Sequence, residues 1–426
     1  MRLGLLALAC ALLAAARASA DPITFVQQRE NYLVFDDVNA TVQSDTWGSR
    51  GAILDGWRAL EQGYLAHHPD DGDFLIIYTT WRLTDAAAFY QAMANDVTGI
   101  GYEHHSDPTL PATTTFDDTP GSRFKGFLHM ADFHAYMAAD GTPDDEAISL
   151  VFGQELGHAW LATVYFDQGM GAGPQQTLLG RDASHWSFYL HTGGSPVEGN
   201  DWTDNGDGTF TARKLTTFQF SDLDLYLMGL VPPAMVRPFF LIENPTNCVD
   251  SALANMACAA PTGHQFRAAQ YRVTGTKRVI TIDDVIRAEG ARAPAYPNAP
   301  SHYGVSFILV KRAGEQIPEA DLVNLSHVVD RSVSLWVAQT RGFASLDIKT
   351  RGEVGGAHAI IGNAESTQLV GFSIKKNGRT IAGGRRPIRY RSRSENWKLV
   401  SLRAVNVPSP LSVQSLPSTG EPPVCR

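Results

Sequence analysis

The sequence predicts an α+β protein with a small β-rich module near its C-terminus. Two apolar runs rich in β-forming residues, 73–81 and 125–133, are typical of buried strands. In residues 319–339, apolar side chains recur at helical spacing and predict a long amphipathic helix. Beyond Gly355-Gly356 the chain becomes β-like and basic. We therefore expect a mixed main domain over residues 21–350 and a basic β-rich module over residues 351–404.

The first twenty residues have the pattern of a secretory signal peptide. Met1-Arg2 precede an apolar run that ends near Ala16, and Ala18-Ser19-Ala20 form a small-residue cleavage pattern. The run is too short for a permanent anchor, and no later stretch is apolar enough to span a membrane. We expect a secreted protein, extracellular or periplasmic, that is monomeric and has no transmembrane segment. Residues 405–426, rich in proline and serine, are expected to form a flexible tail.

The composition limits which classes of partner the protein can bind and indicates how its cysteines are used. The formal net charge of -9 argues against nucleic acid, because recognition of phosphate needs a basic surface. The chain of 426 residues is long enough to bury a large core without a metal. Cys248 and Cys258 are close enough in sequence to form a disulfide in an oxidising compartment, and Cys425 is left as a spare thiol.

The segment before residue 165 is expected to contain two helices and a strand. Residues 84–97 are rich in alanine with helical spacing, and predict a helix after the first strand. A second helix should follow the strand at residues 125–133. Thr142 is suited to cap that helix, Pro143 to open it, and residues 144–146 are acidic, which favours the positive end of its dipole. We expect it to run to about Tyr165.

The remaining elements follow from turn and cap signals. Residues 186–191 predict a strand. Residues 200–214 predict a hairpin around Asn205-Gly206-Asp207-Gly208, which we prefer to a calcium loop because the glutamate of an EF-hand is missing. A short segment, 221–230, is stopped by two prolines. Residues 281–290 predict a short helix between a capping threonine and a terminal glycine.

The feature with most bearing on function lies on the second of these helices. Gln154-Glu155-Leu156-Gly157-His158 is the zinc-binding pattern H-E-x-x-H with glutamine at the first histidine. In the intact pattern, two histidines one turn apart bind the metal and the glutamate acts as general base. His185 follows 27 residues after His158 and is a candidate third ligand.

With this motif, the chain resembles secreted bacterial metallopeptidases of the zincin type. The resemblance extends over about residues 73–350 and implies zinc-dependent hydrolysis of an extracellular peptide or protein substrate. It implies Glu155 as general base and His158, His185 and Gln154 as metal ligands. Met228 resembles the methionine below some zincin sites. The strand at residues 125–133 is then expected to pair with an extended substrate.

Glutamine at position 154 leaves a second interpretation open. Its amide is neutral and suits zinc poorly. The alternative is a catalytically inactive zincin-fold binding protein, in which the motif forms a hydrogen-bonded cluster with a donor such as Arg181 and binding uses the basic module. That module holds ten Lys or Arg and one acid in residues 375–403. Other side chains that could replace the missing ligand are His104, His105, His129, His134, Asp182, Asp222 and Asp224.

Overall fold

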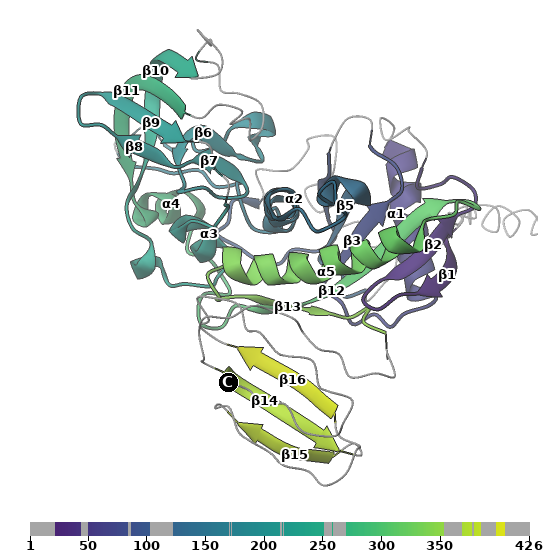
Figure 1. The fold of residues 1–426 in the computed structure, drawn as a ribbon. Helices are drawn as coiled ribbons and strands as arrows, with labels where there is room; N and C mark the ends of the chain where they lie inside the picture. Colours follow the sequence, from purple (N-terminus) through teal and green to yellow (C-terminus); the bar gives the residue numbers. More distant parts are fainter. Residues whose placement is uncertain are drawn as a thin grey trace, which may run out of the picture. The chain divides into compact units, whose positions relative to one another are not determined.

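The computed structural model describes most of the main domain and three strands of the C-terminal module (Figure 1). The described residues are 22–43, 50–83, 87–102, 122–169, 171, 173–213, 215, 217–250, 258, 270–352, 369–376, 379–384 and 398–404. The expected signal peptide and tail lie outside them. The chain falls into two units, Met1–Arg351 and Gly352–Arg426. None of the described helices has the length and apolar character needed to cross a bilayer.

A seven-stranded mixed sheet forms the base of the first unit. Its strands are β1 (Thr24–Gln28), β2 (Leu33–Asp37), β3 (Phe74–Thr79), β4 (Phe89–Ala92), β5 (Gly126–Asp132), β12 (His302–Arg312) and β13 (Ser345–Ile348). The order is β1-β2-β12-β3-β5-β4, with β13 also pairing β12. The inner strands β2, β12, β3 and β5 are parallel, whereas β1 and β4 are antiparallel to their neighbours. This mixed architecture is compatible with the expected α+β class, and the two expected apolar runs are confirmed as β3 and β5.

Helices cover both faces of this sheet, as parallel strands require. The helices of the unit are α1 (Arg50–Leu65), α2 (Asp145–Gly157), α3 (Asp222–Leu227), α4 (Ile282–Glu289) and α5 (Glu319–Gln339). Along β3, Leu75 and Ile77 join a buried cluster with Trp57 of α1. Phe74 and Ile76 belong to the larger cluster, which α2 and α5 share. Figure 1 shows α5 lying along the sheet beside α2.

A second, six-stranded sheet carries the segment that follows the motif helix. Its strands are β6 (Trp186–His191), β7 (Glu198–Asn200), β8 (Trp202–Asp204), β9 (Thr209–Arg213), β10 (Phe239–Asp250) and β11 (Gln270–Ile280), in the order β7-β6-β10-β11-β9-β8. The expected strand at residues 186–191 and the hairpin around Asn205 are confirmed. Cys248 of β10 is joined to Cys258, with Cα atoms 5.4 Å apart, as expected.

The second unit contains a three-stranded antiparallel sheet. Its strands are β14 (Leu369–Lys376), β15 (Arg379–Gly384) and β16 (Lys398–Ala404), in the order β15-β14-β16. The β-rich character expected for this region is therefore present. Its basic side chains lie outside the described part of the structure.

Two helix predictions were wrong in type or extent. Residues 89–92 form β4 rather than a helix. Phe89 and Tyr90 pair with β5, and this pairing outweighs the helix propensity of the alanines. Residues 84–86 lie outside the described part of the chain. The motif helix begins later and ends earlier than expected, with Asp144 as its N-cap and His158 as its C-cap.

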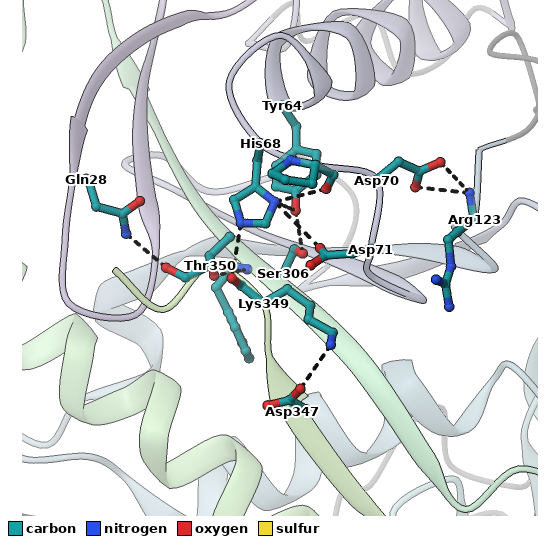
Figure 2. A network of polar contacts seen from close by, with 12 residues as sticks. Gln28, Tyr64, His68, Asp70, Asp71, Arg123, Ser306, Asp347, Lys349 and Thr350 are labelled. Carbon is teal, nitrogen blue, oxygen red and sulfur yellow. Dashed lines mark hydrogen bonds and ion pairs between the residues drawn. The ribbon is translucent and has the colours of Figure 1, made fainter. Parts of the chain in front are cut away.

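A polar network ties the last residues of this unit to its beginning (Figure 2). His68, just after α1, approaches the Lys349 carbonyl with Nε2 at 3.0 Å, and its Nδ1 lies 2.5 Å from the Tyr64 hydroxyl. The same hydroxyl lies 2.7 Å from Ser306 Oγ of β12. Next to it, Gln28 donates to the Thr350 carbonyl at 2.9 Å. We call Tyr64, His68, Ser306 and Lys349 the His68 clasp.

Candidate functional site around Gln154, His158, His185 and Arg181

The motif residues are held by a buried helix with a well-formed start. Asp144 accepts a hydrogen bond from the Ala147 backbone N–H at 3.0 Å, and Asp145 and Glu146 occupy the first turn, where negative charge is favoured. At the other end, the backbone N–H of His158 still bonds to the Gln154 carbonyl at 3.1 Å. Although His158 is the C-cap, the one-turn spacing between positions 154 and 158 is therefore preserved.

The helix ends where the chain is closely packed. A Cβ atom added to Gly157 would lie 2.8 Å from Val197 Cγ2, so a side chain at this position would displace the segment before β7. Shortly afterwards Ala162 adopts a left-handed conformation with φ of 61°. The left-handed conformation of Ala162 turns the chain away from the helical path, so the helix does not continue to Tyr165 although the apolar pattern does.

The structure brings His185 to the motif helix. Its Nε2 lies 3.1 Å from Gln154 Nε2, and its ring centroid lies 4.8 Å from that of His158, with the two rings nearly perpendicular. The next residue, Trp186, is anchored from α3, because its indole N–H donates to the buried carboxylate of Asp224 at 2.8 Å. The three residues expected to meet, Gln154, His158 and His185, are thus close neighbours.

Arg181 lies against the histidine nitrogen that would have to bind a metal. Its Nη2 is 2.7 Å from His185 Nε2, and its Nε donates to Glu198 Oε1 at 2.6 Å. A guanidinium has only donors and does not lose its proton in proteins. His185 Nε2 must therefore be the acceptor, so the lone pair of this nitrogen is used by Arg181.

Two buried carboxyl groups flank this guanidinium. Glu155 is 4% exposed and Glu198 is 6% exposed. Burial raises the pKa of Glu155 to about 8, against the opposing effects of the Arg181 charge and a hydrogen bond from the Tyr90 backbone N–H. Burial also raises the pKa of Glu198, while Arg181 acts to lower it. Burial removes the water that would stabilise a charge on either group, and the positive charge of Arg181 offsets only part of this loss.

These residues do not fit a zinc ion. Within the described part of the chain, no group of three or more His, Cys, Asp or Glu side chains is placed to hold a metal. The neutral amide of Gln154 stands where a third strong ligand is needed. In addition, a fixed positive charge lies at the nitrogen of His185 that zinc would need. The arrangement is a hydrogen-bonded cluster centred on Arg181.

The other described candidate ligands have partners of their own, except Asp182, which pairs with Arg181 of the cluster. His129 is buried between Trp57 and Phe89, and burial lowers its pKa to about 3. His134 bonds to Asp132 at 2.8 Å. Asp222 pairs with Arg237 and Arg341, Asp182 with Arg181, and Asp224 with Trp186. Met228 is the buried C-cap of α3, and its carbonyl accepts a bond from Arg292. His104 and His105 lie outside the described residues.

Sequence reasoning missed Glu198, and it placed the substrate strand incorrectly. Glu198 follows a Gly-Gly-Ser-Pro turn, and the sequence around it has no periodic pattern. The one available signal was that a buried carboxylate requires a positively charged partner. The strand expected to pair with substrate, β5, is already paired with β3 on one side and β4 on the other. Among the described strands, the edge of the sheet next to the site is β4.

Comparison with known proteins identifies no family for this chain. No family model, no curated protein and no solved structure matches it.

Proposed function

We propose that this chain is an exported, zincin-like protein that binds polypeptide outside the cell and does not hydrolyse it. The observation that carries the proposal is the contact between Arg181 Nη2 and His185 Nε2, at 2.7 Å. Zinc hydrolysis needs three protein ligands and an open position for water. Here Gln154 stands at one ligand position. At the second, the lone pair of His185 Nε2 already accepts a hydrogen bond from Arg181.

The first experiment measures metal and hydrolysis together in the exported protein. After zinc has been supplied and excess removed, we expect no zinc retained by the wild-type chain and no cleavage of an unfolded protein substrate. Glu155→Gln should then leave this absence of activity unchanged. One zinc per chain that is lost in His158→Ala, with hydrolysis that is lost in Glu155→Gln, would show that the protein is a working peptidase.

Strand β4 is the element best placed to receive an extended chain. Tyr90 gives its backbone N–H to Glu155, so the outer edge of β4 runs past the site. Hydrogen-bonding directions alternate along a strand, so Ala92 has its peptide groups on the same outer side as Tyr90. Its carbonyl accepts the Gln91 side-chain amide at 3.0 Å, an exchangeable contact that an added strand can replace.

The second experiment tests this edge with proline. Ala92→Pro removes an outward N–H from β4 and should weaken binding of unstructured polypeptide, measured by fluorescence anisotropy. Val26→Pro is the matched control, since Val26 lies in a bulge of β1 at the far edge of the same sheet. Equal binding by the two variants would place the polypeptide site elsewhere.

A further inference from the structure

The site contains two buried carboxyl groups, and the guanidinium of Arg181 contacts one of them. Glu198 Oε1 lies 2.6 Å from Arg181 Nε, and the charge of Arg181 acts on Glu155. Leaving a buried carboxylate such as that of Glu198 without a positive partner is strongly unfavourable. In a zinc site, the metal ion supplies this positive charge. Here the guanidinium supplies it from the protein itself.

The turn that carries Arg181 has an unusual backbone conformation. Asp182 and Ala183 both adopt left-handed conformations, with φ of 57° and 50°. A Cβ atom on Gly180 would lie 2.8 Å from the Trp186 carbonyl, so the turn is packed against the start of β6. Such conformations are unfavourable for residues other than glycine and persist where surrounding contacts fix them. The backbone of the turn is therefore fixed, and the contacts with His185 and Glu198 hold the guanidinium in place.

We propose that Arg181 replaces the metal cation of this site, and that Gln154 and Arg181 together keep zinc out. The inference rests on the proposed function, and it adds which two residues exclude the metal. Gln154 removes one strong ligand, while Arg181 occupies the lone pair of another and provides the positive charge. Neither residue alone both removes a metal ligand and supplies the positive charge. Reversing the two together should convert the cluster into a zinc site.

The test compares four proteins for binding of Zn²⁺ by calorimetry and of Co²⁺ by its visible absorption. These are the wild type, Gln154→His, Arg181→Ala and the double variant Gln154→His/Arg181→Ala. We expect the double variant to bind one ion per chain, about 100-fold more tightly than Gln154→His alone, since the latter keeps the competing guanidinium. The wild type and Arg181→Ala should bind no ion at a defined site.

The possible results separate the two proposals. If Gln154→His alone binds zinc as tightly as the double variant, Arg181 does not stand in the place of the metal and the inference is overturned. If the wild type binds one zinc, the proposed function itself fails. Arg181→Lys/Gln154→His serves if the alanine form does not fold, since lysine keeps the charge but loses the planar group that bonds Glu198 and His185 together. We expect that form to bind zinc more tightly than Gln154→His alone, because the planar group no longer occupies the lone pair of His185, and binding no tighter than that of Gln154→His would contradict the inference.

Discussion

At the residue scale, the glutamine at position 154 changes the groups that the site presents to a cation. A histidine at position 154 would present a third nitrogen lone pair, whereas the glutamine presents an amide that lies 3.1 Å from His185. The cluster then depends on hydrogen bonds from Arg181, which are directional and fixed by the protein. Glu155, the expected general base, becomes a buried carboxyl group with a pKa of about 8. At neutral pH much of it carries a proton and is unable to accept one from water.

The hydrogen bond between Trp186 and Asp224, which holds the residue next to His185, can be tested by mutation. Trp186→Phe removes the indole N–H that reaches Asp224, whose side chain is fully buried. We expect a loss of about 1–3 kcal/mol in the free energy of unfolding, because a buried carboxylate loses a donor. Trp202→Phe is the matched control: its indole donates to the Phe188 carbonyl, which keeps its bond from Asn200. Equal losses in denaturant unfolding would contradict this role of Asp224.

His129 predicts a dependence of stability on acid. Burial lowers its pKa from 6.5 to about 3 in the folded protein. The unfolded chain therefore binds a proton first, and stability is retained above pH 6.5 and falls as the pH decreases toward 3. The slope contributed by one such group is about 1.4 kcal/mol per pH unit. Unfolding of His129→Gln should show a flatter acid limb than the wild type, and an unchanged slope would argue against this assignment.

At the scale of elements, prediction succeeded where the local signal was strong. The helix at residues 319–339 and the capped helix that ends at Gly290 are confirmed, since amphipathic spacing and caps are encoded locally. The prediction failed for residues 89–92, where pairing with β5 is a long-range contact. It also failed for the end of the motif helix, where Gly157 is packed against Val197, a residue forty positions away in sequence.

The candidate site was only partly predictable for a similar reason. The spacing of the motif led to Gln154, Glu155 and His158, and His185 was expected from the resemblance. Arg181 was named only as a possible donor, and Glu198 was not named. Both are fixed by turns whose backbone geometry has no clear signature in sequence. A buried ion pair of this kind becomes visible only when the fold brings its members together.

The His68 clasp should stabilise the end of the first unit. His68→Ala removes the contacts with the Lys349 carbonyl and the Tyr64 hydroxyl. We expect a loss of about 1–2 kcal/mol and faster amide hydrogen exchange in β13 and the residues after it. His327→Ala, an exposed histidine of α5, is the control and should change stability by less than about 0.5 kcal/mol. Unchanged exchange in His68→Ala would show that the clasp is dispensable.

The disulfide in the second sheet should have a separate, local effect. Replacing Cys248 and Cys258 by serine removes a cross-link between residues ten positions apart. A link of this kind is typically worth about 2–4 kcal/mol. Thermal unfolding of Cys248→Ser/Cys258→Ser should therefore begin at lower temperature, with hydrogen exchange increased first in β10 and β11. If the loss appeared first in the seven-stranded sheet, the two sheets would be more tightly coupled than we expect.

At the scale of the whole molecule, the division after Arg351 predicts independent folding of the first unit. A chain of residues 22–351 should unfold with the same free energy as the full protein, within about 0.5 kcal/mol. A chain of residues 22–300 should fail to form the seven-stranded sheet, because β12 is missing. Circular dichroism and denaturant unfolding of the two fragments would test both statements, and a stable fold in the shorter one would contradict the second.

The place of β12 also determines when the protein is able to fold. β2 and β3 are made early, yet they lie on either side of β12, which is more than two hundred residues further along the chain. Until synthesis has passed residue 312, the early strands have no central partner, and closing so long a loop is slow. The seven-stranded sheet therefore stays incomplete while most of the chain is produced. An open chain is the form that a narrow translocation pore is able to pass, so the order of the strands is compatible with the export that we propose.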